Sequence, residues 1–171
     1  RYRDLHNVQM KQLGDIKVQF NPARIVSTGA KIDSKTLEKR PCFLCDTNRP
    51  KEQMAKYLDD KFSLLVNPFP ILPTHFTVPA KRHQLQSIKK NYGEIYKILS
   101  RFDDIIVFYN GPKCGASAPD HMHFQAGTSG IILCARQFMN SLEDSSLEEV
   151  KRAIEDVPFL AAYYAVGDKY I

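Results

Sequence analysis

The strongest constraint on this chain is the stretch Asn110–Gln125, which directly follows a compact apolar run at Ile105–Tyr109. A short apolar run of this kind predicts a buried strand. The stretch after it combines flexible backbone with polar side chains at Gly111, Gly115, Ser117, His121, His123 and Gln125. Side chains at every second position of an extended chain lie on one face. Two imidazoles and an amide are therefore expected to point together beside a glycine-containing loop, a combination typical of phosphate chemistry.

The whole chain, residues 1–171, has the length and composition of a single globular domain. It contains 43% hydrophobic and 25% charged residues, and no apolar run reaches the ~18 residues that a membrane span needs. The net charge of +5 arises from 24 basic and 19 acidic residues that are spread along the sequence. Because no basic tract could neutralise many phosphates of a polymer, we expect a small anionic ligand, with no nucleic acid and no membrane as partner.

Cysteine usage predicts a metal site in a reducing compartment. The chain has four cysteines, at Cys42, Cys45, Cys114 and Cys134, and this is too sparse for a secreted disulfide framework. We therefore expect a cytoplasmic protein, although the N-terminus lacks an initiator Met and looks trimmed or internal. A redox role for the Cys-x-x-Cys pair would favour its lying at the start of a helix, whereas the polar residues and proline at 46–50 indicate a knuckle. The pair favours metal binding over redox chemistry.

Histidines elsewhere could complete this metal site. Zn²⁺ in structural sites prefers four sulfur or nitrogen ligands in a tetrahedron. Of the five histidines in the chain, His83 and His121 would give a Cys₂His₂ set with Cys42 and Cys45. His123 would then remain free, two residues from a ligand, to act as a nucleophile.

The hydrophobic pattern predicts an α+β fold with an antiparallel sheet of about five strands and one long helix packed on it. Amphipathic periodicity predicts that helix over 85–102. Strands are expected at 16–20, 62–66, 75–78, 105–109 and 131–134, a short helix at 52–58, a second helix at 145–156, and a strand or buried helix at 159–166. The prolines between 67 and 73 predict an irregular loop, in which Phe69 and Ile71 either wall a base pocket or form a packed connector. Arg24 lies beside a run of small residues and either grips a phosphate or is an ordinary surface residue.

Taken together, these motifs resemble one branch of the histidine-triad (HIT-like) superfamily. The residues that carry the resemblance are Cys42-Phe-Leu-Cys45 with Asn48, His83 after Val78-Pro79, and Asn110…Gly115-Ala-Ser117…His121-x-His123-x-Gln125. The branch contains the galactose-1-phosphate uridylyltransferases, the dinucleoside polyphosphate phosphorylases and the GDP-hexose phosphorylases. The segment around Ser117 is more similar to the phosphorylases, and the cysteine pair to the uridylyltransferases. The matched motifs run from about Phe20 to Gln125.

The resemblance implies covalent nucleotidyl transfer. His123 would attack the α-phosphorus of a nucleoside diphosphate-sugar or a dinucleoside polyphosphate, and phosphate or a sugar phosphate would then take the nucleotidyl group in a ping-pong reaction. Gln125 and Ser117 would hold the phosphoryl oxygens. Histidine-triad hydrolases usually carry His at the third position of the motif, so Gln125 favours transfer to an acceptor other than water.

The resemblance also assigns the remaining residues. It implies that Cys42, Cys45, His83 and His121 bind a structural Zn²⁺, that His75 is a structural histidine outside the site, and that the substrate is bound by Arg24, Asn67, Phe69, Asn110 and Gly115. Transferases of this branch contain two related halves, and only one His-x-His-x-Gln half is present here. We therefore expect a chain that is one half of such an architecture, a short member, or a homodimer that completes its site. Two other functions compete: a histidine-triad hydrolase, and a zinc-stabilised nucleotide-binding module without turnover.

Overall fold

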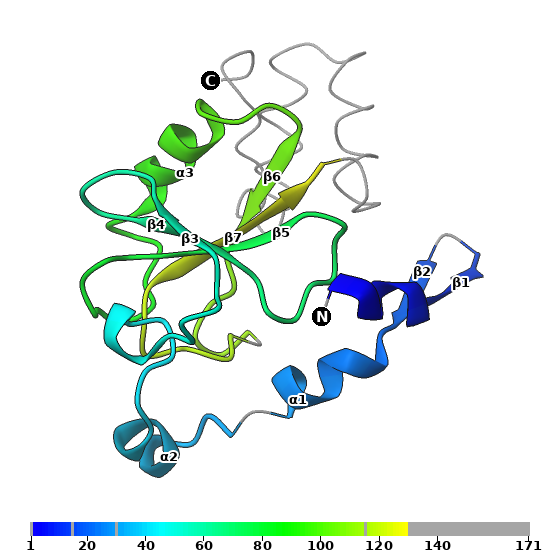
Figure 1. The fold of residues 1–171 in the computed structure, drawn as a ribbon, viewed down its shortest axis with the longest axis horizontal. Coiled ribbons are helices and arrows are strands. Elements are labelled where there is room, and N and C mark those ends of the chain that lie inside the picture. The colour runs from blue at the N-terminus through cyan, green and yellow to red at the C-terminus, as the bar shows by residue number, and fades with distance from the viewer. Residues whose placement is uncertain (1, 15, 30, 115, 130–171) are drawn as a thin grey trace, which may run out of the picture.

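A computed structural model describes residues 2–14, 16–29, 31–114 and 116–129. The elements expected at 131–134, 145–156 and 159–166, together with Gly115, lie outside the described residues. The described chain is α+β, as predicted, and is built on a five-stranded antiparallel sheet with the order β3-β4-β5-β7-β6 (Figure 1). Its strands are β3 (Ala55–Tyr57), β4 (Ser63–Val66), β5 (His75–Pro79), β6 (Ile105–Phe108) and β7 (His123–Thr128).

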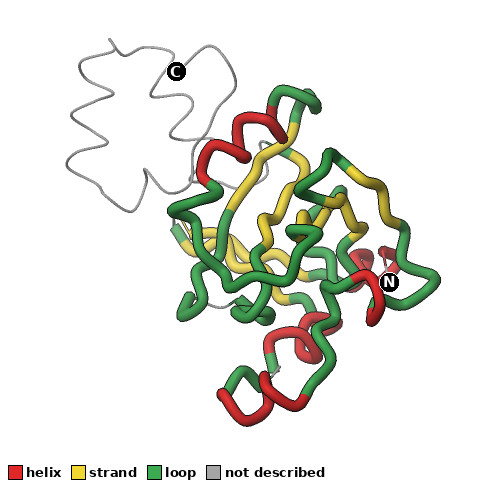
Figure 2. Tube along the Cα trace, turned by 90° about the vertical axis from the view of Figure 1, so that its left-hand side faces the viewer, coloured by secondary structure: helices red, strands yellow, loops and turns green. Residues whose placement is uncertain are grey.

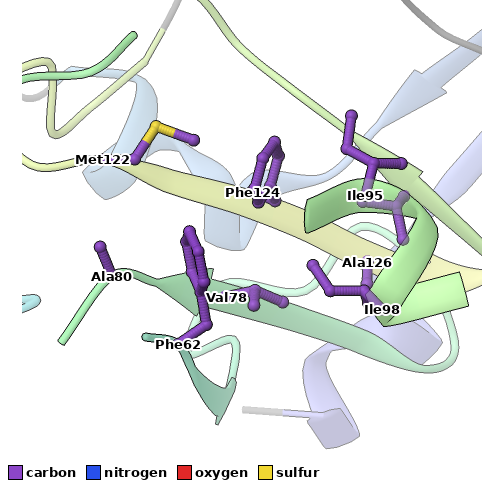
Figure 3. Close-up of a cluster of buried hydrophobic side chains, with 9 residues drawn as sticks. Phe62, Val78, Ala80, Ile95, Ile98, Met122, Phe124 and Ala126 are labelled. Carbon is purple, nitrogen blue, oxygen red and sulfur yellow. The ribbon is translucent and has the colours of Figure 1, made fainter. Parts of the chain in front are cut away.

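The hydrophobic core lies between one face of this sheet and helix α3 (Tyr92–Leu99). Phe124 and Ala126 of β7 are fully buried on that face, and Ile95 and Ile98 of α3 pack toward them (Figure 3). The core cluster also contains Phe62, Val78, Ala80, Val107 and Met122. Because strand side chains alternate between faces, the intervening residues of β7 are left for the opposite face. The expectation of a helix packed on an antiparallel sheet is therefore confirmed.

The helix is shorter than its periodicity predicts. Residues 85–91 belong to the predicted helix over 85–102, but they form no helix in the structure, and Leu85 is 76% exposed. The segment is instead held by the chain beside it. Met122 donates its backbone N–H to the Gln84 carbonyl at 2.7 Å, and Gln86 donates to the Pro119 carbonyl at 3.3 Å. These contacts with distant backbone outweigh the local helical pattern up to residue 91.

The helix predicted at 52–58 is also wrong, because the range contains no helix and its centre, 55–57, is strand β3, which pairs with β4. A turn at Asp59 closes the hairpin. Its carboxylate accepts hydrogen bonds from the backbone N–H groups of Lys61, at 2.7 Å, and Phe62, at 2.8 Å. The Leu58 N–H then reaches the Phe62 carbonyl at 3.0 Å. An aspartate that binds the backbone two and three residues ahead is a strong turn signal, and here it decides the structure.

An N-terminal arm lies beside the main sheet. Strand β2 (Ile16–Phe20) forms as predicted, but it pairs with β1 (Gln9–Leu13) in a separate two-stranded sheet (Figures 1 and 2). Val18 and Phe20 are 42% and 60% exposed, so the expectation of a half-buried strand is wrong. The rest of the arm contains the short helices α1 (Ile25–Thr28) and α2 (Ser34–Lys39) and 3₁₀ helices at Tyr2–Asn7 and Pro22–Arg24, and a further 3₁₀ helix follows at Asp46–Asn48. No helix in the described ranges is both long and apolar enough to cross a membrane.

The proline-containing loop between β4 and β5 folds back onto the sheet at Gly127. A Cβ atom at this glycine would lie 2.5 Å from the Leu72 side chain and 2.6 Å from the Thr74 carbonyl oxygen. Only a residue without a side chain therefore permits the loop to approach β7 so closely. As predicted, the loop contains no regular secondary structure.

Candidate functional site

A cavity of about 840 Å³ opens on the face of the sheet that is opposite the core. Its floor includes Thr77 of β5 together with His123 and Gln125 of β7, which alternate with the core residues of the same strands. The structure brings seven of the eight sequence-predicted catalytic and substrate-binding residues to this cavity: Arg24, Asn67, Phe69, Asn110, Ser117, His123 and Gln125. The eighth, Gly115, lies outside the described residues. A volume of this size is in the range of small-molecule sites.

His123 is held in one tautomer by a backbone carbonyl two residues before it. Its Nδ1 lies 2.8 Å from the carbonyl oxygen of His121, and a carbonyl can only accept a hydrogen bond. Nδ1 therefore carries the proton, and Nε2 keeps its lone pair. Burial is the largest cause that lowers the pKa of His123, so the neutral imidazole is favoured. The geometry is that of an available nitrogen nucleophile at the wall of a cavity.

Gln86 clamps the backbone of His123, and sequence reasoning missed it. Its side-chain carbonyl accepts the His123 N–H at 2.7 Å, while its –NH₂ group donates to the carbonyls of His123, at 3.0 Å, and Asn110, at 2.9 Å. Gln86 is only 4% exposed, and its two bonds to His123 are buried. The sequence offered no local signal for this role. The pattern placed this residue on the polar face of a helix that does not form there.

The four predicted metal ligands come together in one cluster. The ligand atoms of Cys42, Cys45, His83 and His121 all lie within 4.8 Å of one another. The Cys42 sulfur is 3.2 Å from Nδ1 of His121, and the Cys45 sulfur is 3.3 Å from Nδ1 of His83. Ligand atoms around a tetrahedral Zn²⁺ are separated by roughly 3.3–3.8 Å, given metal–ligand bonds of ~2.0–2.3 Å. The cluster could therefore bind a metal ion and is compatible with zinc.

The electrostatics of the cluster also fit a divalent cation. Burial is the largest cause and opposes ionisation of the Cys42 thiol, but the hydrogen bond with His121, the backbone hydrogen bonds of Leu44 and Cys45 and the charge of His121 together outweigh it and bring the pKa of Cys42 to about 6. For Cys45, burial and then the neighbouring Cys42 raise the pKa to about 11. Two thiolates this close repel each other unless a cation neutralises them. Nε2 of His121 lies 2.7 Å from the Ala80 carbonyl, which fixes its proton there and turns Nδ1 toward the sulfurs.

The cysteine pair lies in a loop, as predicted. Its backbone is closed by a hydrogen bond from the Cys45 N–H to the Cys42 carbonyl at 3.2 Å. The Asn48 side chain donates to the same carbonyl at 3.0 Å. Arg40 makes further contacts: its guanidinium donates to the Ser117 carbonyl at 3.0 Å and to the Asp120 carboxylate at 2.9 Å. The cysteine loop and the loop that carries Ser117 are thereby joined.

The residues predicted to wall a nucleotide are positioned by the arm and by the proline-containing loop. The Arg24 guanidinium donates to the Phe69 carbonyl at 3.0 Å, and burial lowers the Arg24 pKa. The Asn67 side chain accepts the Phe69 N–H at 2.8 Å and donates to the Thr77 hydroxyl at 2.9 Å. Phe69 lines the cavity, whereas Ile71, the other candidate for the wall, is not among its lining residues.

His75 lies under the cavity and contacts Gln125 directly. Its Nε2 is 2.9 Å from Oε1 of Gln125, and its Nδ1 accepts the backbone N–H of Ile71 at 3.1 Å. The ring is completely buried, and burial is the largest cause that lowers its pKa to about 4. The motif resemblance implies a structural residue here, and sequence reasoning did not anticipate the contact with Gln125.

Comparison with known proteins places the chain in a family. A solved structure with some likeness is a HIT family hydrolase from Clostridium thermocellum, with 15% sequence identity and a TM-score of 0.40 over 53% of this chain and 90% of that chain. No curated protein sequence matches the chain. A family described as a domain of unknown function, DUF4922, matches residues 1–128 of the 171-residue chain. Because this match spans more than half of the sequence, the chain belongs to the DUF4922 family.

Proposed function

We propose that this chain is a nucleotidyltransferase or phosphorylase that works through a covalent nucleotidyl-histidine intermediate on His123. The observation that carries the proposal is the tautomer of His123, whose Nδ1–H donates to the His121 carbonyl at 2.8 Å beside a cavity of about 840 Å³. A histidine that serves as nucleophile needs an unprotonated nitrogen aimed at the substrate and a partner for the positive charge that develops on the ring. The carbonyl supplies that partner.

In the first step the Nε2 lone pair attacks the α-phosphorus of the donor nucleotide. The P–N bond forms as the bond from this phosphorus to the bridging oxygen breaks, and the sugar phosphate or remaining nucleotide leaves with that oxygen. An acceptor phosphate oxygen then attacks the same phosphorus, the P–N bond breaks, and neutral His123 is restored. Ser117 and Gln125 line the cavity beside His123 and provide donors for the phosphoryl oxygens.

The metal cluster fits a structural role in this proposal. Bound Zn²⁺ would join three segments of the chain through Cys42, Cys45, His83 and His121. It would also fix His121, whose carbonyl orients His123. A divalent metal at this position thus supports the nucleophile without touching the substrate.

Intact-mass spectrometry tests the proposal. The protein is incubated separately with UDP-glucose, GDP-glucose and diadenosine tetraphosphate, and we expect at least one of them to leave an acid-labile nucleotidyl adduct. His123→Ala should remove the adduct, whereas His6→Ala, a histidine outside the cavity, should retain it. An adduct that persists in His123→Ala would place the nucleophile elsewhere.

A second measurement separates transfer from hydrolysis. Adding inorganic phosphate or a sugar phosphate should accelerate consumption of the donor that forms the adduct, because the acceptor discharges the intermediate. A rate that is independent of either acceptor, with the free nucleotide as product, would make the chain a hydrolase.

A further inference from the structure

Gln125 belongs to the predicted catalytic set, and the orientation of its amide depends on a neighbour outside that set. A glutamine side chain offers a carbonyl oxygen on one side and two N–H donors on the other. Which side faces a ligand decides whether the site attracts a hydrogen-bond acceptor or a donor. The two orientations have nearly the same shape, so the choice has to come from the surrounding hydrogen bonds.

The surroundings of His75 determine that orientation. A backbone N–H can only donate, so the bond of 3.1 Å from Ile71 makes Nδ1 of His75 an acceptor. In the neutral ring the proton must then lie on Nε2, which donates to Oε1 of Gln125 at 2.9 Å. The carbonyl of Gln125 is thereby turned toward His75. Its –NH₂ group accordingly faces away, and no described residue accepts a hydrogen bond from it.

The position of His75 is itself strongly constrained. The Tyr2 hydroxyl donates to the His75 carbonyl at 2.7 Å and accepts the His75 N–H at 3.2 Å. The imidazole stacks on Phe108, with ring centroids 6.1 Å apart and an interplanar angle of 24°. His75 pairs with Gly127 on the neighbouring strand β7. Because Gly127 has no side chain, the loop that carries Ile71 can pack directly against β7.

We propose that His75 is a positioning residue that locks the Gln125 amide with its –NH₂ group toward the cavity, so that this part of the cavity selects an acceptor-only, anionic group such as a phosphoryl group. The inference rests on the proposed function for the identity of the ligand, but the lock itself is a property of the unliganded protein. A reversed Gln125 would present its carbonyl oxygen to the phosphoryl oxygens, and the two acceptors would repel. His75 therefore contributes to specificity without contacting the substrate.

Two matched substitutions distinguish this role from a merely structural one. In His75→Gln, the terminal –NH₂ occupies a position similar to that of Nε2 and can still donate to Gln125. In His75→Asn, the shorter side chain can replace only Nδ1, as the acceptor for Ile71. The assay uses whichever of UDP-glucose, GDP-glucose and diadenosine tetraphosphate labels the wild type. We expect adduct formation to slow by about 10-fold to 100-fold in His75→Asn, the range typical of losing a hydrogen-bond partner that orients a metal ligand. His75→Gln should stay within about 3-fold of the wild type.

A double-mutant cycle with Gln125→Ala shows whether the effect acts through Gln125. In that background, His75→Asn should change the rate by less than about 2-fold, because the amide to be oriented is gone. A full additional loss in the Gln125→Ala background, or an equal loss in His75→Gln and His75→Asn, would overturn the proposal.

A spectroscopic measurement on the wild type needs neither a variant nor a substrate. Long-range ¹H–¹⁵N spectra of the histidine rings should show the His75 proton on Nε2 and an unprotonated Nδ1. A proton on Nδ1 would overturn the inference whatever the enzyme assays show. If the ring has the expected tautomer but no donor forms an adduct, the proposed function fails while the positioning role stands.

Discussion

At the scale of single residues, the site is built from pairs in which one member holds the other. The His121 carbonyl fixes the proton of His123, and Gln86 binds both the N–H and the carbonyl of His123. His75 holds Gln125 in the same manner. The residues that would touch a substrate therefore depend on hydrogen bonds made by residues that would not, and rigid support of this kind is what accurate catalytic geometry requires.

The buried neutral ring of His75 makes a prediction about stability and pH. Its pKa is lowered to about 4 in the folded protein, first by burial, against ~6.5 in an unfolded chain. Below pH 6.5 the unfolded chain binds the proton more readily, so stability should fall as the pH falls from about 6.5 to about 4. Over that range the contribution is about 3 kcal/mol.

Urea unfolding at several pH values measures this contribution. The wild type should lose about 3 kcal/mol more than His75→Gln between pH 7 and pH 4, because glutamine does not titrate. The two chains share every other titrating group, so their difference isolates His75. Identical pH dependence in the two would show that this ring is not kept neutral by the fold.

The sequence could predict residues whose role follows from short spacing, and it missed those whose role depends on distant partners. The cysteine pair and the alternation of His123 and Gln125 are local patterns, and the structure brings all of them to one region. His75 and Gln86 reach partners 50 and 37 residues away. No local pattern specifies such a contact, so their roles emerge only when the sheet is assembled.

At the scale of elements, the structure predicts opposite effects on stability when a methyl group is added at Gly127, where the loop at 67–74 meets strand β7, and at Gly93. Gly127→Ala should destabilise the protein by about 1–3 kcal/mol, because the new methyl group would meet the Leu72 side chain and the Thr74 backbone. Gly93 lies in α3 and has no atom within 4 Å of an added Cβ. Gly93→Ala should therefore stabilise by up to about 1 kcal/mol.

Urea denaturation of both variants tests the pair, with Gly93→Ala as the matched control for adding one methyl group. A neutral effect at Gly127 would mean that the loop can withdraw from the sheet. Because that loop carries Ile71, its withdrawal would also be expected to slow adduct formation.

Three strands of the main sheet, β4, β5 and β6, were predictable because they are short apolar runs bounded by turns. Two helix predictions went wrong for identifiable reasons. The first part of the 85–102 stripe is bound to residues 119–122 and to His123 rather than coiled on itself. The 52–58 segment is drawn into the sheet by the Asp59 turn. In both cases contacts made by the assembled fold outweigh local propensity.

At the scale of the whole molecule, the cysteine and histidine cluster cross-links segments that are far apart in the sequence. Metal analysis of the purified protein should give about one Zn²⁺ per chain, and the value should fall in Cys42→Ser and His83→Ala. Cys45 and His83 are separated by 38 residues. Removing a cross-link over a loop of this length should lower the free energy of unfolding by about 4 kcal/mol on the chain-entropy scale.

The control is Cys114→Ser, which removes an exposed cysteine that lies outside the cluster and should leave the zinc content unchanged. If wild-type protein that has been purified without chelators contains no zinc, the assignment is contradicted. The metal content is independent of any nucleotide, so this result does not depend on the proposed reaction.

The expectation of a second half or a homodimer that completes the acceptor site stays a prediction.

The alternation of cavity and core residues along β7 limits where insertions and deletions can occur among relatives of this chain. His123 and Gln125 alternate with Phe124 and Ala126, so inserting or deleting one residue here would exchange the faces. Polar groups would enter the core while phenylalanine entered the cavity. A change in length at 111–114, which precedes the strand, would leave the two faces of β7 unchanged. Among relatives, gaps in an alignment should therefore fall before residue 118. They should be absent from the His-x-His-x-Gln segment, because the sheet fixes the register of its side chains.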